Sequence, residues 1–532
     1  MPVVLRSNPE GTLLSLCVYR LVSKPSKTPS TPIHNLDDDS LLNIFSFCRP
    51  IFFDNHEHGN IEWNWGHEHW WYKLVQVCRR WRYLIISSAL HLRFYLLCTR
   101  GTPVADMLAH SPPFPLFINL NTEIYHPTTE DEERIMLALQ HRDRVRRIRL
   151  QVPIQSLHNL ITAIDGEFPV LEYLHIAPSS ERDAHFTLPS TFEAPHLRHL
   201  WLDHFTSPMG SLSFTTAVGL VSVVLRWIYP SAYPGYPHPD DLLQPLSHLP
   251  RLETLQIGFT SPGSDGDIER QLSHRPVMTH VMLPRLRQFR FWGINAFLEA
   301  LLSQMSAPLL ETLSVHLFDP PNFVVPHLRN FMTTTEDLRF RSVKFLFSRS
   351  VVAMFAYPFV GATLPTFNID NACPLLDRQV SSVAQIFSAL SPIFSTVVEL
   401  TLDYEAYVPL SSSWDNPTHR ADWRKLLGSF RNVKTVRVHP NLVEVLASSL
   451  KSYGESPLEV LPRLEELVCP KGSRSNETVA IFIREREVAG QSVTLIERGL
   501  PVGHFDYEFL TSYGRTRTFA SSYSYGWSPD PW

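Results

Sequence analysis

Four histidines lie close together near the N-terminus, and imidazole is a common zinc ligand and a common general base. They are His56, His58, His67 and His69, arranged as two His-x-His pairs beside acidic residues and two tryptophans. No cysteine partner is nearby and HExxH is absent, so the segment does not have the ligand spacing of a zinc site. We interpret it as a solvated loop and expect no metal and no cofactor; a loop metalloenzyme is the alternative.

The rest of the sequence also lacks the common catalytic motifs. GxGxxG, GxxxxGK[ST] and GxSxG, which cradle phosphates or present a nucleophilic serine, do not occur. The carboxylates are dispersed, and the other histidines occur singly. We therefore expect no catalytic residues and predict that the chain is not an enzyme.

Length and composition indicate a large folded protein with more than one domain or a repeat array. The chain has 532 residues, more than one hydrophobic core usually holds, and a net charge of −5, which gives no reason to expect nucleic acid or a membrane surface as a partner. The six cysteines are scattered without a CxxC pair. This pattern favours a reduced, intracellular protein, cytoplasmic and/or nuclear. The apolar stretch Thr12–Val22 is interrupted by Arg20, so we expect no secretory signal.

Two amphipathic helices are predicted after a Ser/Pro-rich linker. Asp37 to Asp39 favour the start of a first helix, which carries Leu41, Leu42 and Phe45 and ends before Pro50. A stripe at helical spacing predicts a second helix, with basic residues largely off it. This stripe consists of Leu74, Val77, Cys78, Trp81, Leu84, Ile85 and Ser88. A short third helix is expected after Pro103. Periodicity alone also fits an ordinary helical hairpin packed on its own protein.

The residues in these helices resemble the F-box, whose usual pattern is Leu-Pro, a helix ending in Ile-Phe, and later Val-Cys-basic-x-Trp. Leu36 opens the pattern here, Ile44-Phe45 closes the first helix, and Val77 to Trp81 supply the second signature. WWYKLVQVCRRWRYLI, followed by GTPVADMLAHSPP, looks like the F-box proteins of mushroom-forming fungi. Two departures are Asp37, which replaces the usual proline, and the insertion at 49–69.

The resemblance implies docking on the Skp-type adaptor of a cullin–RING ubiquitin ligase core. The residues that it implies for adaptor binding are Leu36, Leu41, Leu42, Ile44, Phe45, Val77, Cys78 and Trp81. It also implies that the remainder of the chain captures a protein substrate. The alternative is a protein-binding scaffold with a vestigial F-box and no ligase role, which the two departures leave open.

One short phrase, Pro-x-Leu-x-x-Leu-x-apolar, recurs after residue 140. Copies are PVLEYLHI (169–176), PHLRHLWL (195–202), PRLETLQI (250–257), PRLRQFRF (284–291), PLLETLSV (308–315) and PRLEELVC (462–469). Copies without the proline begin at residues 143, 395 and 431, and GLVSVVL (219–225) fits a further strand. Helical stretches lie between the copies. A strand and a helix in each unit of 24 to 36 residues is typical of a leucine-rich repeat. A two-layer α/β domain with coincidental phrases is the alternative.

The predicted fold class is an α/β repeat, a leucine-rich-repeat solenoid, preceded by a small all-α F-box helical module. The expected parts are an N-terminal segment and linker (1–32), the module (33–95), connecting helices and a first strand (96–140), the solenoid (141–498) and a tail (499–532). Stacked repeats should pair in parallel and bury the leucines of the phrase. These leucines are Leu171, Leu174, Leu197, Leu200, Leu252, Leu255, Leu286, Leu310, Leu313, Leu464 and Leu467.

Side chains alternate along a strand, so the residues flanking each second leucine should face the concave surface of the solenoid. The copies that begin at 143, 169 and 195, and the copy at 284, place basic and aromatic residues there: Arg147, Arg149, Tyr173, His175, His199, Trp201 and Arg290. This composition is typical of a binding hot spot and suits an acidic or phosphorylated protein substrate. The alternative is that the segment 203–249 folds over this face and buries Trp201.

Overall fold

The computed structural model describes the chain in segments, and the residues between them are outside the description. The described residues are 32–48, 70–88, 92, 95–121, 127–179, 186–206, 216–228, 236–259, 265–318, 323–335, 338–348, 351–373, 376–404, 417–450, 460–471 and 477–498. The chain divides into two compact units. Unit 1 comprises residues 1–119 and 128–146, and unit 2 comprises residues 120–127 and 147–532.

Unit 1 begins with the predicted helical module. The elements from the N-terminus to residue 140 are a 3-10 helix (Pro32–Asn35), α1 (Asp38–Phe47), α2 (Trp70–Val75), α3 (Arg79–Ser87), β1 (Leu96–Cys98), α4 (Val104–His110), β2 (Leu116–Asn121) and α5 (Thr129–Gln140). β1 and β2 pair in parallel, with Leu96 opposite Leu116. α5 starts at a capping box in which Thr128 and Asp131 satisfy each other's backbone N–H groups.

A succession of strands and helices makes up unit 2. Its strands are β3 (Val145–Val152), β4 (Tyr173–Pro178), β5 (His199–Asp203), β6 (Ser222–Ile228), β7 (Thr254–Phe259), β9 (Gln288–Gly293), β11 (Thr312–Phe318), β12 (Ser342–Phe347), β13 (Val351–Tyr357), β14 (Phe367–Ala372), β15 (Glu399–Tyr404), β16 (Thr435–Val438), β17 (Glu466–Pro470) and β18 (Thr494–Arg498). The short strands β8 (Val281–Met282) and β10 (Met305–Ser306) pair separately.

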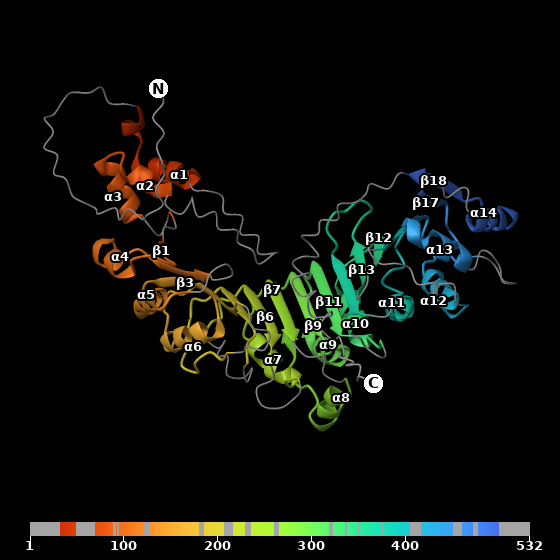
Figure 1. Ribbon diagram of the computed structural model, residues 1–532, viewed down its shortest axis with the longest axis horizontal. Coiled ribbons are helices and arrows are strands. Elements are labelled where there is room, and N and C mark those ends of the chain that lie inside the picture. The colour runs from red at the N-terminus through yellow and green to blue at the C-terminus, as the bar shows by residue number, and fades with distance from the viewer. Residues whose placement is uncertain are drawn as a thin grey trace, which may run out of the picture. The chain divides into compact units, whose positions relative to one another are not determined.

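Helices lie between many of these strands, although the described residues form none between β4 and β6 or between β12 and β14. They are α6 (Ile154–Ala163), α7 (Pro239–Leu246), α8 (Asp265–His274), α9 (Asn295–Leu302), α10 (Pro326–Thr334), α11 (Leu376–Leu390), α12 (Pro417–Gly428), α13 (Val443–Leu450) and α14 (Glu477–Val488), with a 3-10 turn at Pro440–Leu442. Figure 1 shows α7, α9 and α10 along one side of β6, β7, β9 and β11.

The strands of unit 2 form a large, mostly parallel sheet. Their order is β3-β4-β5-β6-β7-β9-β11-β14-β13-β12-β15-β16-β17-β18. β4 and β5 pair in parallel, as the stacking of repeats predicts. The sequence also predicts the strand β6, which lies between β5 and β7.

The proline of the phrase lies in a turn that precedes β4, β5, β7, β9, β11 and β17. In the first copy the Leu171 N–H donates to the Phe168 carbonyl, which closes a turn with Pro169 at its second position. The same bond joins Leu197 to Ala194, Leu252 to Leu249, Leu286 to Leu283, Leu310 to Ala307 and Leu464 to Leu461. Proline suits the second position because its φ is already near −65°. The leucines of the phrase that were predicted to be buried are all buried, which confirms the predicted core.

The core lies between the sheet and the helices. Phe259 of β7 and Phe291 of β9 both contact Phe297 of α9, with ring centroids 4.8 and 6.3 Å apart, respectively. The alternate residues, such as Gln256 and Arg290, therefore point to the other side of the sheet. We call this other side the open face. It is formed by the residues of β3 to β18 that alternate with the buried residues of the core.

One part of the sheet departs from the expected stacking. β12, β13 and β14 form an antiparallel meander, and their order in the sheet is reversed, so that β14 pairs with β11 and β12 with β15. Leu346, Ala353 and Phe355 form a second apolar cluster on the open face of this meander. The expectation that each strand pairs in parallel with the next is wrong here, because a hairpin joins neighbouring strands in antiparallel directions.

Candidate protein-binding surfaces

Helix α1 begins where its acidic residues predict. Asp37 is the N-cap, and its carboxylate accepts a hydrogen bond of 2.7 Å from the Ser40 N–H. That bond holds the pKa of Asp37 below its usual value. Leu41 and Phe45 lie one turn apart on the buried side of the helix. The residue that replaces the usual F-box proline therefore starts the helix by capping it.

The predicted second helix is interrupted. α2 ends at Val75 and α3 starts at Arg79, with a turn between them. Cys78 caps α3, its sulfur accepting from the Trp81 N–H at 3.4 Å, and the Arg82 Nε donates to the Val75 carbonyl at 3.0 Å. The expectation of one continuous helix is wrong because side chains satisfy the backbone groups on both sides of the turn. Val77 lies in this turn and is exposed.

Helices α1 and α3 are held together by one ring contact and one ion pair. The Phe45 and Trp81 rings meet edge to face, with centroids 4.8 Å apart. The Arg80 guanidinium donates to Asp38 Oδ1 at 2.7 and 3.0 Å and to the Leu36 carbonyl at 2.6 Å. Asp38 and Arg80 are both partly exposed, so the ring contact and the buried leucines contribute most of the stabilisation.

The residues predicted to bind an adaptor thus fall into three groups. Leu41 and Phe45 are buried in the module, Leu36, Leu42, Cys78 and Trp81 are half-buried, and Ile44 and Val77 are exposed. Sequence reasoning missed Phe47, Tyr83 and Ile86, which are exposed apolar residues of the same helices. Phe47 could have been found from its spacing, because it lies one turn after Ile44 and off the stripe of Leu41 and Phe45.

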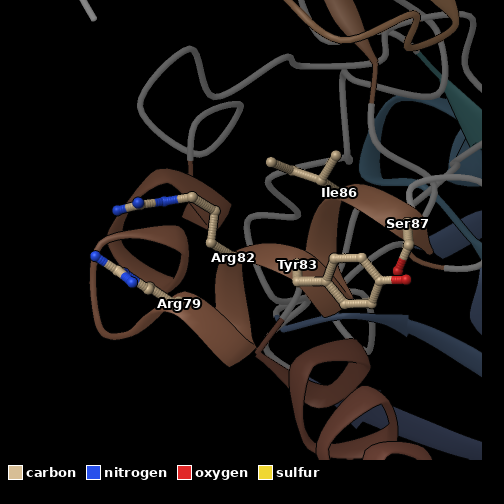
Figure 2. A pocket seen from close by; sticks show the side chains of 5 residues that line it. All are labelled: Arg79, Arg82, Tyr83, Ile86 and Ser87. Atoms are coloured by element: carbon tan, nitrogen blue, oxygen red, sulfur yellow. The ribbon is translucent and has the colours of Figure 1, made fainter. Parts of the chain in front are cut away.

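The side of α3 that faces away from its buried residues, Leu84 and Ile85, carries both basic and apolar groups. A shallow, open depression of about 330 Å³ is lined by Arg79, Arg82, Tyr83, Ile86 and Ser87. Figure 2 shows these five side chains. All five residues come from one helix, whereas a small-molecule site is usually a concave pocket with convergent polar groups. The depression is better suited to contact with another protein than to enclosing a small ligand.

The structure brings most of the residues predicted to bind substrate into two rows across the open face. Arg147, Tyr173 and His199 lie opposite one another on β3, β4 and β5, and so do Arg149, His175 and Trp201. Arg290 also lies in the second row, but on β9, three strands away from Trp201. Val224 of β6 and Gln256 of β7 lie between Trp201 and Arg290 in that row. At about 4.8 Å per strand it is roughly 14 Å from Trp201, so it does not belong to the same cluster.

Trp201 is less available than the sequence predicts. Its ring stacks on His175 of β4 at 4.9 Å, and the Arg226 guanidinium of β6 lies 4.5 Å from the ring centroid. Since β4 and β6 lie on opposite sides of β5, these groups cover opposite faces of the indole. The indole N–H donates to Asp203 at 2.9 Å. The segment 203–249 thus covers Trp201 in part, through Arg226, and leaves it half-buried.

Electrostatics in this cluster favour a neutral histidine beside an ionised aspartate. Burial, together with the positive charges of Arg149 and Arg226, lowers the pKa of His175 to about 3. Burial would raise the pKa of Asp203, but the positive charge of Arg226 and its two hydrogen bonds, at 2.9 and 2.8 Å, outweigh burial and keep the pKa below its usual value. Sequence reasoning missed Asp203 and Arg226, because they meet only when β5 and β6 pair.

Several sequence predictions concern residues that the structure does not describe. The four histidines at 56–69, the insertion at 49–69, the N-terminal segment before residue 32 and the tail from 499 lie outside the described residues. Within the described residues, no group of three His, Cys, Asp or Glu side chains could hold a metal ion. None of the helices in that part of the chain has the length and apolar character needed to cross a bilayer.

Comparison with known proteins leaves the family of the chain open. No family model matches the sequence, and no curated protein matches it. Among solved structures, the leucine-rich repeat-containing protein LegL7 from Legionella pneumophila is similar, with 13% identity and a TM-score of 0.26. The alignment covers 75% of this chain and 99% of that chain. The function must therefore be inferred from the residues of the chain itself.

Proposed function

We propose that the chain is the substrate-recognition subunit of a Skp/cullin/F-box type ubiquitin ligase. Helices α1 to α3 bind the Skp-type adaptor, and the repeats of unit 2 form a leucine-rich-repeat solenoid whose open face binds a protein substrate. The chain is not an enzyme in this proposal. It acts by proximity, because it raises the effective concentration of a substrate lysine near a separate conjugating enzyme.

The observation that carries the adaptor proposal is the set of exposed apolar residues on α1 and in the turn before α3. Phe47 is 87% exposed and Val77 is 58% exposed, although the same short helices have a buried core of their own. Exposed apolar groups gathered on one small module are typical of a protein interface. Val77 also belongs to the Val-Cys-basic-x-Trp signature of the F-box resemblance.

The substrate part of the proposal rests on the open face of unit 2. Many of its side chains are polar, charged or aromatic, apart from residues such as Val224 and the cluster Leu346, Ala353 and Phe355, whereas the opposite side is almost entirely apolar. Stacked repeats expose an extended sheet of this kind, and repeat proteins commonly use it to bind other proteins.

Adaptor binding can be tested by co-expression with a Skp-type adaptor followed by co-purification. Wild type should retain the adaptor, and Phe47→Asp and Val77→Asp should each weaken its retention at least about tenfold, since a buried interface charge costs more than 1.4 kcal/mol. Val488→Asp is the matched control, because Val488 is 84% exposed on α14 in the other unit. Retention of the adaptor by both module variants, or no retention by wild type, would remove the ligase role.

The choice of variants matters because the adaptor-binding candidates also include buried residues. Leu41 is fully buried, so an aspartate there should unfold the module whether or not it binds an adaptor. Phe47 and Val77 avoid this problem. If wild type captures no adaptor but binds a protein through unit 2, the interaction scaffold with a vestigial F-box is the function that remains.

A further inference from the structure

Arg149 is a buried cation on the open face of unit 2. It lies in the second row across the strands, opposite His175 of β4, and it is only 6% exposed. Within the described residues its guanidinium reaches one acceptor, the neutral amide oxygen of Gln151, at a long 3.4 Å. Its Nε is buried and makes no hydrogen bond there. A guanidinium carries several N–H donors, so this single bond leaves most of them available.

The carboxylate of this part of the face is engaged elsewhere. In the described strands β3 to β9 the one acidic residue is Asp203. It accepts two hydrogen bonds from Arg226 and one from the Trp201 indole. A buried cation without a carboxylate costs free energy of folding, and charged side chains are almost never fully buried unless they are paired. Arg149 is therefore an exception that folding alone does not explain.

The neighbouring imidazole of His175 responds to this charge. Burial lowers its pKa most, and the positive charges of Arg149 and Arg226 lower the pKa further, to about 3, although Asp203 acts in the opposite direction. His175 is consequently neutral at neutral pH. It adds no second positive charge beside Arg149, and it offers a ring nitrogen to a ligand only as a neutral donor or acceptor.

The surroundings of Arg149 allow a partner to approach. Gln151, the next residue of β3 on this face, is half-buried, and so are Tyr173 and Trp201 on the neighbouring strands. The bond from Arg149 to Gln151 is at the long limit for a hydrogen bond, so a better acceptor can replace it at little cost.

A carboxylate matches this single guanidinium better than a phosphate does. Two parallel N–H groups of arginine fit the two oxygens of a carboxylate, and the charges of the two groups cancel. A phosphate group carries nearly two negative charges at neutral pH and gains most from several cations. Because His175 stays neutral, it does not provide a second cation beside Arg149.

We infer that Arg149 binds a carboxylate of the protein substrate on the open face of unit 2. This inference rests on the proposed function, in which the open face binds the substrate, and it names the chemical group that is recognised there. The carboxylate belongs to an acidic side chain or to a chain terminus. Binding would satisfy the donors that the fold leaves unused. In the free chain the same arginine costs stability, so binding and stability make opposite demands on this residue.

The stability of the full chain tests the second part of this inference. Arg149→Met keeps a long, unbranched side chain and removes the charge, so it should raise the midpoint of urea unfolding by a few tenths of a molar. Arg226→Met is the matched comparison on the same face. It should lower the midpoint, because it leaves Asp203 without its guanidinium partner. An unchanged or lower midpoint for Arg149→Met would mean that Arg149 supports the fold, and would overturn the inference.

Small carboxylates test the binding itself. N-acetylglutamate α-amide presents a side-chain carboxylate, N-acetylglycine presents a terminal one, and N-acetylglutamine α-amide is the neutral control. At least one of the two acids should raise the urea midpoint of wild type and leave that of Arg149→Met unchanged, because a ligand that binds only the folded wild type stabilises it. Which acid acts identifies the source of the carboxylate. The neutral amide should shift neither protein.

A second arginine variant controls for net charge. Arg285 is exposed in the turn before β9, so Arg285→Met should respond to the acids as wild type does. Equal shifts in wild type and Arg149→Met, or no shift in wild type, would overturn the inference. Inorganic phosphate is the remaining probe. A shift by phosphate that depends on Arg149 and exceeds the shifts by both acids would overturn the choice of a carboxylate.

The adaptor experiment keeps the two proposals apart. Adaptor capture reports on α1 to α3, whereas the response to carboxylates reports on unit 2. Adaptor capture without an Arg149-dependent response would remove this inference and leave the ligase role. An Arg149-dependent response without adaptor capture would support the carboxylate site and remove the ligase role.

Discussion

The halves of the open face, β3 to β9 and β11 to β17, share a scaffold and differ in the chemistry that it displays. In both halves the buried residues of each strand build the core, and the alternate residues lie in register across the sheet. The described strands of the first half place arginines and Asp203 on this face, whereas those of the second place Lys344 and Arg437 there among four carboxylates. Because the core uses only every second residue, the other residues can change in charge without altering the fold.

Two histidines make the difference between the halves measurable. The pKa of His175 is lowered to about 3, by burial first and then by the charges of Arg149 and Arg226. Burial would also lower the pKa of His316, but the adjacent carboxylate of Asp370 outweighs it and raises the pKa above 6.5. The same side chain thus responds in opposite directions, because its charged neighbours have opposite signs.

The largest expected effect comes from removing one carboxylate in each half. Asp203→Ala should lower the free energy of unfolding by roughly 2–3 kcal/mol, because Arg226 loses its ion pair and the Trp201 N–H loses its acceptor. Asp403→Ala should cost about 1 kcal/mol, since its partners are the Tyr404 N–H, at 2.8 Å, and Lys344, a flexible cation that can reach solvent. Urea unfolding of both variants gives the comparison. Equal losses would contradict the view that the first half depends more strongly on its single carboxylate.

A smaller effect is expected from the titration of His175. Its pKa in the folded state is about 3, against 6.5 in the unfolded state, so the unfolded state binds more protons between these values. Stability should therefore fall as the pH is lowered below 6.5, by up to about 1.4 kcal/mol per pH unit. His175→Gln removes this contribution, and its urea midpoint should depend less on pH between 6.5 and 4.5. If the urea midpoints of wild type and His175→Gln change equally with pH, His175 is not held neutral in the folded state.

Much of unit 2 could be predicted from the sequence because local physics determines it. The phrase supplies a proline for the turn and two leucines for the core, and the alternation of side chains then sets the rows of the open face. Arg149, His175 and Trp201 were predicted to share that face, and the structure aligns them. Arg226, which covers one face of Trp201, could not be predicted there, because its place depends on the register between β5 and β6.

The meander was not predicted, for a physical reason that its residues show. β13 reads VVAMFAY and is apolar on both sides, so it has no alternation that indicates which face is buried. Its neighbours lack the Pro-x-Leu phrase, and the direction of pairing depends on the hairpin between β12 and β13. The interruption between α2 and α3 is similar, because the stripe continues through it and the break depends on two local bonds, from Arg82 to the Val75 carbonyl and from the Trp81 N–H to the Cys78 sulfur.

The smallest expected effect concerns His316, and NMR can measure it at a single ring. The pKa of this histidine should lie above 6.5 in wild type and below 6.5 in Asp370→Asn, because burial then acts without the opposing carboxylate. A raised pKa means that the contribution to stability is complete below 6.5 and is lost as the pH rises through the folded pKa. Raising the pH from 6 to 8 should thus destabilise wild type more than Asp370→Asn. Asp403→Asn is the control, because β13 and β12 separate β15 from β14, and it should leave the His316 titration unchanged. A His316 pKa below 6.5 in wild type would mean that Asp370 does not outweigh burial, and the contrast with His175 would be lost.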